Sequence, residues 1–290
     1  MKKAILYLHT AVLLAGFTPI FGKAIDLNEG ILVWFRLFLS ALIAGVLFGS
    51  MGKLRKLPSK TIMKIAGVGL ILAMHWVLFY GSVKYSNASV AVVCISAAGF
   101  FSALIEPFLL KKRINTIEVL LGLLAIAGVY IIFDFHPHFQ KGVIFGILAA
   151  LGSAIFPIFN KKLVSEYSAD TITFYEMGGG WMLLTFVVPI YMQFMPAQSY
   201  VPGLQDIFWL IILSLFCTVL AFNLSVRALS RISAFTVNLT FNLEPVYGIL
   251  LAFLIYKEHL ELGFSFYAGL VVIFTTVVIQ SIRVAKNLAT

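Results

Sequence analysis

The chain carries ten apolar stretches that are each long enough to cross a lipid bilayer as a helix, and this pattern restricts the fold more than any other feature. The first five cover Ala4–Ile25, Ile31–Ser50, Ile62–Lys84, Ala88–Leu110 and Ile117–Phe135. The second five cover Gly142–Phe159, Thr171–Phe194, Asp206–Val226, Ser233–Tyr256 and Leu262–Ile282. A membrane-spanning helix needs roughly 20 apolar residues, whereas a tilted barrel strand needs about half as many. The sequence therefore predicts an all-α integral membrane protein with ten transmembrane helices.

Composition supports a membrane location and argues against nucleic-acid binding. Hydrophobic residues make up 61% of the 290 residues and charged residues 11%, against about 45–50% and about 25% in soluble domains. The net charge of +9 is spread over short basic runs between the apolar stretches, which is a topology signal. We expect a small-molecule substrate and membrane lipid as partners, no nucleic acid, and a monomer or homodimer.

The basic residues also predict the orientation of the chain. If the N-terminus is cytoplasmic, most of the 21 Lys and Arg residues fall in the cytoplasmic segments, as the positive-inside rule requires. We therefore expect a multi-pass protein of the cell membrane with both termini in the cytoplasm. The N-terminal lysines and apolar run look like a signal peptide, but the apolar stretch continues to Ile25, so a retained first helix is expected.

The two halves of the sequence repeat each other. Pro19–Lys23 reads PIFGK and Pro157–Lys161 reads PIFNK, with a glycine upstream of each, at Gly16 and Gly152. Each half holds five spans. Because five is an odd number, the second half enters the membrane with a topology inverted relative to the first. The sequence thus predicts two inverted five-helix repeats, residues 1–137 and 138–290. In transporters with this architecture, the substrate site lies near the midplane between Pro- or Gly-interrupted helices.

The predicted interruptions fall in the first, fourth, sixth and ninth spans. The residues assigned to kinks or gates are Pro19, Gly99, Glu106, Pro157 and Pro245. Glu106 lies near the inner end of the fourth span and is out of register with the second half. We interpret it as lining a gate or an inner vestibule.

These features together resemble the EamA-type ten-helix transporters of the drug/metabolite transporter superfamily. The resemblance is carried by Gly16, by Arg36 early in the second span, and by Glu244-Pro245 with the run Tyr256–Leu260. Two positions of the fourth span depart from the family pattern: glycine 99 replaces proline, and Lys112 replaces glutamate. The resemblance implies export or exchange of small metabolites and leaves the cargo open.

Glu244 is the most constrained candidate for a binding residue. A carboxylate at the centre of a membrane helix costs about 2.5–3.5 kcal/mol, and Pro245 follows it directly. Asn238 and Asn242 share a helix face because they are four residues apart. Two interpretations stay open: a kinked helix with a packing glutamate, or the wall of a substrate cavity. In the second, Glu244 binds a cargo amine when ionised and releases it when protonated.

Arg36 and Glu176 occupy equivalent positions of the two repeats, each about two turns into a span. Arg36 is either a snorkelling or helix-capping arginine or a planar fork for a substrate carboxylate or phosphate. Glu176 either pairs with a lysine such as Lys161 or takes an amine or a proton.

The third span contributes His75, Trp76 and Tyr80. His75 can relay protons or can be fixed by a backbone carbonyl, and the two rings can line a cavity or serve packing. The glycines Gly178–Gly180 predict a close helix approach.

No catalytic set, nucleotide-binding loop or metal-binding spacing occurs in the sequence, and we expect no cofactor. His136 and His138 fall in a polar loop and are interpreted as solvated. The sequence favours a secondary transporter that exports or exchanges an amino acid or similar small organic solute by alternating access. A membrane enzyme or an assembly subunit is the alternative.

Overall fold

The computed structural model describes residues 2–111, 113–134, 137–196, 199–232, 237, 240–241 and 243–289. Within these residues every regular element is a helix. Seven helical segments are long and apolar enough to cross a membrane: 3–24, 29–50, 59–85, 88–110, 140–163, 169–194 and 204–229. Three shorter apolar segments, Thr116–Ile132, Glu244–Tyr256 and Phe264–Thr276, lie where the fifth, ninth and tenth spans were predicted. The all-α membrane fold is therefore confirmed.

The helices begin and end within a few residues of the predicted limits, except that the described helix of the ninth span begins at Glu244 and the helix of the tenth runs on to Ala289. The first half contains α1 (Lys2–Gly16), α2 (Thr18–Ala24), α3 (Glu29–Ser50), α4 (Ser59–Tyr85), α5 (Ala88–Ile95), α6 (Ala98–Leu110) and α7 (Thr116–Asp134). The second half contains α8 (Gln140–Leu163), α9 (Ala169–Phe194), α10 (Leu204–Ser214), α11 (Ala221–Leu229), α13 (Glu244–Tyr256) and α14 (Phe264–Ala289). Three short elements complete the fold: the 3-10 helices η1 (Pro137–Phe139) and η3 (Glu258–Leu260), and the π-helix η2 (Leu215–Leu220).

Polar side chains fix several of the helix starts. The side chains of Asn28, Asn87 and Ser168 accept hydrogen bonds from backbone N–H groups in the first turns of α3, α5 and α9. Each therefore satisfies a donor that would otherwise be left without a partner inside the bilayer boundary.

The interrupted spans differ from the predicted kinks. Pro19 and Pro245 stand in the first turns of α2 and α13, where a missing backbone N–H costs no helical hydrogen bond. They mark new helix starts rather than bends in a continuous helix. The fourth span is interrupted between α5 and α6, just before Gly99. Of the three prolines assigned to kinks or gates, Pro157 alone stands inside an unbroken helix, α8.

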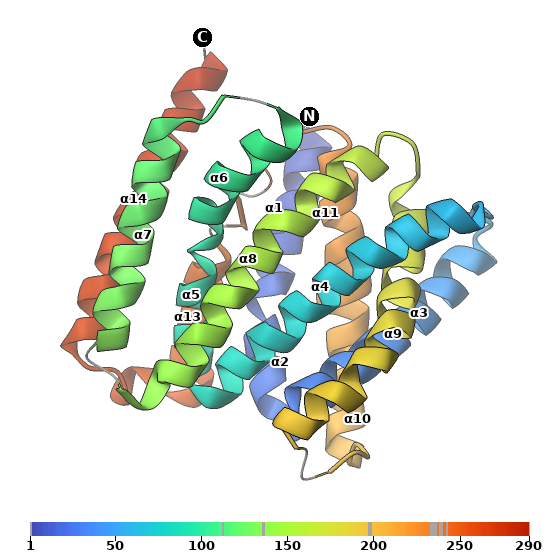
Figure 1. Cartoon of the computed structure of the whole chain (residues 1–290), viewed down its shortest axis with the longest axis horizontal. Helices are drawn as coiled ribbons and strands as arrows, with labels where there is room; N and C mark the ends of the chain where they lie inside the picture. The colour runs from blue at the N-terminus through green and yellow to red at the C-terminus, as the bar shows by residue number, and fades with distance from the viewer. Residues whose placement is uncertain are drawn as a thin grey trace.

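The bundle is held together by a few extensive helix pairs. Helix α4 packs against both α8 and α9, α3 packs against α9, and α7 packs against α14, as Figure 1 shows for the α4–α8 crossing and the α7–α14 pair. The α4–α9 crossing is close: a Cβ added at Gly180 would lie 2.7 Å from the carbonyl oxygen of Gly69. The predicted close approach at the triple glycine is thus confirmed.

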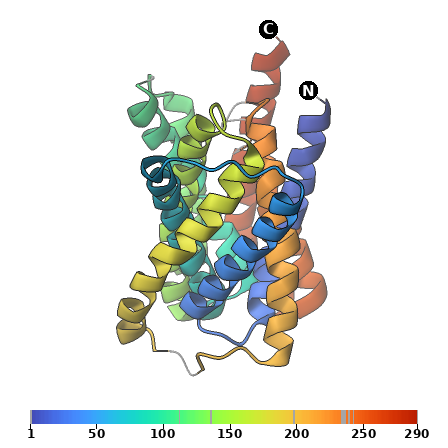
Figure 2. The ribbon, with the colours of Figure 1, turned by 90° about the vertical axis from the view of Figure 1, so that its right-hand side faces the viewer.

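The outward face of the bundle is apolar. On α9, Met182, Phe186 and Ile190 are all exposed and follow one another at four-residue spacing along one helix face. Large apolar side chains in such a stripe are suited to contact with lipid tails. The start of α1 and the end of α14 lie at the same end of the bundle (Figures 1 and 2).

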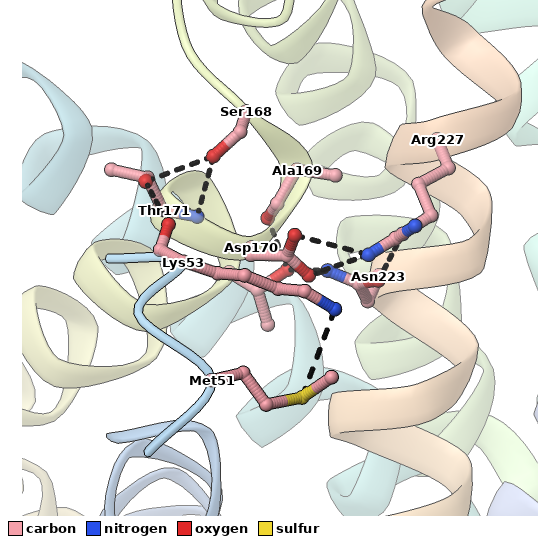
Figure 3. A network of polar contacts seen from close by, with 9 residues as sticks. Met51, Lys53, Ser168, Ala169, Asp170, Thr171, Asn223 and Arg227 are labelled. Atoms are coloured by element: carbon pink, nitrogen blue, oxygen red, sulfur yellow. Dashed lines mark hydrogen bonds and ion pairs between the residues drawn. The ribbon is translucent and has the colours of Figure 1, made fainter. Parts of the chain in front are cut away.

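A polar network ties α9 to α11 at that same end (Figure 3). Arg227 donates to both carboxylate oxygens of Asp170, at 2.7 and 3.0 Å, and Asn223 donates to Asp170 at 3.1 Å. Thr171, next along α9, donates to the carbonyl of Lys53 at 3.4 Å. The network therefore fixes the α3–α4 connection against the second half of the chain.

Candidate functional site

A cavity of about 440 Å³ lies inside the bundle. Its polar lining includes Arg36, His75, Ser96, Glu106, Arg113, Asn115, Glu118, Asn160, Ser225 and Glu244. Arg113, Asn115 and Glu118 lie at the α6–α7 connection and the start of α7, whereas Arg36 and Glu244 lie in mid-bundle. The cavity therefore extends from the centre of the bundle towards one end. Its volume is within the range typical of small-molecule sites, about 300–1,000 Å³.

Arg36 is held in the cavity wall by a set of directed contacts. Its side chain is 1% exposed, which excludes the snorkelling interpretation. Nε donates to the Thr218 hydroxyl at 2.8 Å, Nη1 to the Tyr80 hydroxyl at 2.7 Å, and Nη2 to the Cys217 carbonyl at 3.2 Å. The guanidinium also stacks on Trp76, 3.7 Å from the ring centroid. These bonds use three of five N–H donors, so the fork retains donor capacity towards the cavity.

The π-helix η2 explains how a backbone carbonyl becomes available to Arg36. A π-helical turn pairs residues five apart and frequently occurs at functional sites. Within η2, Thr218 donates its hydroxyl proton to the carbonyl of Leu213, five residues earlier, at 2.9 Å. Thr218 therefore presents lone pairs to Arg36, and the Cys217 carbonyl lies beside it. Neither residue was predicted, because nothing in the local sequence marks a π-helix.

Glu244 lies in the same cavity wall as Arg36, at the first position of α13. The two side chains interact electrostatically, and within the described part of the chain no ion pair joins them directly. The cavity thus presents a fixed cation and a carboxyl group to one volume. The predicted partners Asn238 and Asn242 lie outside the described residues.

The three predicted residues of α4 lie together around Arg36. Nδ1 of His75 is 2.7 Å from the carbonyl of Ala149, which fits the backbone-bound interpretation, and the ring also lines the cavity. Trp76 lines the cavity as well, whereas Tyr80 is fully buried behind it. Tyr80 therefore contacts the site only through Arg36.

Glu176 does not reach the cavity. It is completely buried and accepts a hydrogen bond from Asn160 Nδ2 at 3.3 Å. The expected ion pair with Lys161 is wrong, because the Lys161 ammonium donates to the carbonyls of Leu229 and Ile232, at 2.6 and 2.9 Å. The lysine points to the α11 terminus instead of into the bundle.

The predicted gate residues divide into two groups. Gly99, Glu106 and Pro157 line the cavity, whereas Pro19 and Pro245 are absent from its lining. A Cβ added at Gly99 would have no atom within 4 Å, so this position borders open space. The apolar lining includes Phe79, Phe156, Phe222 and Phe241. With 27 phenylalanines in the chain, no sequence signal singles these four out.

At the end of the bundle opposite the α6–α7 connection, a buried carboxylate ties three segments together. Glu258 forms an ion pair with Lys23 at 2.9 Å and accepts hydrogen bonds from the backbone of Ala88 at 3.1 Å and of Ser89 at 2.9 Å. The Ser89 hydroxyl adds a bond of 2.6 Å. We call Lys23, Ala88, Ser89 and Glu258 the clasp. It joins α2 and the start of α5, which are parts of the first and fourth spans, to η3, which directly follows the ninth span.

The described residues contain no group of three or more His, Cys, Asp and Glu side chains suited to a metal ion. His136 lies outside the described residues.

Comparison with known proteins places the chain in a family. Residues 2–134 and 140–281 each match the EamA-like transporter family. An uncharacterized transporter of Bacillus subtilis (strain 168), YetK, is 29% identical over 63% of this chain and 57% of its own length. A second B. subtilis transporter, YcxC, is 24% identical over 70% of this chain and 67% of its own. An uncharacterized transporter of Archaeoglobus fulgidus is 29% identical over 44% of this chain and 45% of its own.

The aligned part of the chain thus spans about half of two of these relatives, YetK and the A. fulgidus protein. A solved crystal structure whose description names no function superposes over 100% of both chains with a TM-score of 0.67 at 15% identity, which is a likeness of fold. Because the family match covers nearly the whole sequence, the chain belongs to the EamA-like transporter family, and its helices are those of a multi-pass membrane protein.

Proposed function

We propose that this protein is a secondary transporter of the cell membrane that exports or exchanges an amino acid or similar small organic solute by alternating access. The observation that carries the proposal is the cavity, which holds Arg36 and Glu244 in mid-bundle and reaches one end of the bundle, while the clasp ties the helices together at the opposite end. A solute bound in mid-bundle with access to one side is what an alternating-access carrier requires.

The charges of the cavity suggest a zwitterionic cargo. Arg36 can donate two parallel hydrogen bonds to a carboxylate, the geometry for which guanidinium is suited. Glu244 can accept from a cargo ammonium group on the same wall. The surrounding phenylalanines supply an apolar surface for the rest of the solute. Binding of this kind would pair both buried protein charges with opposite charges of the cargo.

Contacts between the halves support the proposed ten-span, inverted-repeat architecture. The third and sixth spans pack together as α4 and α8. Their equivalents in the opposite halves are the eighth and first spans, and these also pack together, as α11 and α1. The fourth and ninth spans end alike, with Lys111 at φ 52° and Lys257 at φ 54°, the only non-glycine residues with positive φ in the described chain. We assign residues 1–137 and 138–290 to the two repeats.

The orientation follows from the same arrangement. The end of the bundle that holds the start of α1 and the end of α14 also holds the basic residues Arg55, Arg113 and Arg227. We assign this end to the cytoplasm because basic residues are retained there. In this orientation the cavity faces the cytoplasm and the clasp closes the external side. Membrane lipid surrounds the bundle, which acts as a monomer or homodimer and binds no nucleic acid.

Counterflow in proteoliposomes tests the proposal. Vesicles loaded with one unlabelled solute from a panel of neutral, cationic and anionic amino acids should accumulate the matching radiolabelled solute. Glu244→Gln should weaken counterflow of cargo that has an amine and should spare the corresponding deaminated carboxylate, because the amide keeps the size but loses the charge. Glu166→Gln, in the exposed α8–α9 turn, is the matched control. If the folded protein shows no counterflow with any solute of the panel, the proposal is wrong.

A further inference from the structure

Glu176 and Asn160 form a buried pair at the edge of the proposed cargo site. Glu176, on α9, is completely buried, and Asn160, on α8, is 1% exposed. One bond joins them, from Asn160 Nδ2 to Glu176 Oε2 at 3.3 Å. The second carboxylate oxygen, Glu176 Oε1, and the amide oxygen, Asn160 Oδ1, have no hydrogen-bond partner among the described residues.

No cation in the described part of the chain offsets a charge on Glu176. On the elements packed against α9, the charged or titratable groups nearest this level are Arg36 on α3, His75 on α4, Arg227 on α11 and, beside Asn160 on α8, Lys161. The hydrogen bonds of Arg36 run to Thr218, Tyr80 and Cys217, and those of Arg227 run to Asn223 and Asp170. His75 is bound to Ala149, and Lys161 to Leu229 and Ile232.

An ionised carboxylate in this setting would be strongly disfavoured. Burial removes its hydration, and one long bond from a neutral amide replaces little of it. A protonated carboxyl group, by contrast, gains an O–H donor. That donor can bond to Asn160 Oδ1, so that an amide and an acid exchange two hydrogen bonds in a ring. One proton therefore gives both unpaired oxygens a partner.

We infer that Glu176 and Asn160 are a proton-binding site, in which the carboxyl group of Glu176 carries the proton and Asn160 connects it to the cavity. Asn160 lines the cavity and Glu176 lies behind it. Asn160 thus both bonds to Glu176 and faces the cavity of the cargo site. On the basis of the proposed function, we assign the proton as the ion whose movement is coupled to cargo transport.

The two repeats use equivalent positions for different tasks. Arg36 and Glu176 are equivalent, and so are Gly22 and Asn160. In the first repeat, the absent side chain of Gly22 admits the Tyr80 ring, since an added Cβ would lie 2.1 Å from it, and Tyr80 then bonds to Arg36. In the second repeat, Asn160 bonds directly to Glu176. One half therefore supplies a permanent charge, and the other supplies a group that can gain and lose a proton.

Infrared difference spectroscopy tests the proton site without any cargo. At neutral pH, the spectrum of the intact protein minus that of Glu176→Gln should contain the carbonyl stretch of a protonated carboxylic acid, shifted in D₂O. The Gln side chain can form both bonds of the ring, so this variant should fold and melt like the parent protein. Glu166→Gln should instead remove only carboxylate bands. Loss of a carboxylate band in Glu176→Gln would overturn the inference.

Transport by the same variants tests the coupling. In proteoliposomes with a trapped pH indicator, cargo flux should move protons in the parent protein, and Glu176→Gln should retain cargo counterflow but lose the proton movement. Unchanged proton movement in Glu176→Gln would overturn the coupling, as would Na⁺-dependent flux at fixed pH that this variant loses. If no cargo moves in the parent protein, the proposed function fails, and the infrared result alone decides whether the proton site exists.

Discussion

Glu258→Gln should open the external end of the cavity. In the clasp, the Glu258 carboxylate accepts three hydrogen bonds from the first turn of α5 and pairs with Lys23. A glutamine of the same size keeps one acceptor oxygen, but its NH₂ group must face one of the remaining donors. Both the ion pair and at least one charge-assisted bond are then lost.

The size of the effect follows from burial. Glu258 is completely buried, whereas the Lys23 side chain is 32% exposed, so the bonds from α5 contribute more than the solvent-screened ion pair. Disruption of a buried charged network costs about 3–5 kcal/mol. If the clasp forms only when the external end is closed, a loss of about 3 kcal/mol shifts the balance towards the open state by roughly 100-fold.

Thiol labelling from outside the cell measures this balance. A cysteine at Ser96, which lines the cavity, is placed in a chain with Cys94→Ala and Cys217→Ala and is treated with a membrane-impermeant reagent. Glu258→Gln should raise the labelling rate by up to about 100-fold. Glu261→Gln, three residues further on and exposed, should leave it unchanged. Equal rates in folded Glu258→Gln and its parent would refute the role of the clasp.

Three further outcomes are expected. Arg36→Lys should lower the affinity for a carboxylate cargo at least about tenfold in equilibrium binding, because a lysine cannot reproduce the planar fork, and unchanged affinity would make Arg36 structural. Gly16→Val should lower the melting temperature through a loss of about 1–3 kcal/mol, since an added Cβ lies 2.7 Å from that of Tyr247; Gly67→Ala, with open space around it, is the control. A cysteine at Ser199 should react with an impermeant reagent in intact cells and one at Glu166 only after lysis, and the reverse pattern would invert the proposed orientation.

Span positions and charged residues were predictable from the sequence for one physical reason. Lipid tolerates neither unpaired backbone groups nor unpartnered charges. A charged residue inside an apolar span must therefore face the bundle, and Arg36 and Glu244 do meet at one cavity. The predicted limits of the fourth span, Ala88–Leu110, agree with the structure to the residue.

The partners of those charges were not predictable in the same way. Thr218 and the Cys217 carbonyl depend on a π-helix that tertiary packing selects, and the phenylalanines of the lining look like all others in the chain. Asn160 could have been found, because it is the single difference between the two matching pentapeptides. The prolines marked interrupted spans without specifying the kind of interruption, since a proline is equally suited to the first turn of a new helix and to a kink.

The π-helix η2 has a consequence for how the chain tolerates deletions. A π-helical turn holds more residues than an α-helical one, so a deletion of one residue within 215–220 would restore an α-helix and leave the later side chains in nearly the same orientation. Asn223 and Arg227 would therefore keep their bonds to Asp170, while Arg36 would lose its backbone acceptor at Cys217. The same deletion in an ordinary α-helix would rotate every later side chain by about 100° around the helix axis. This short segment can thus lose a residue at the expense of one contact in mid-bundle, without disturbing the contacts at the far end of the helix.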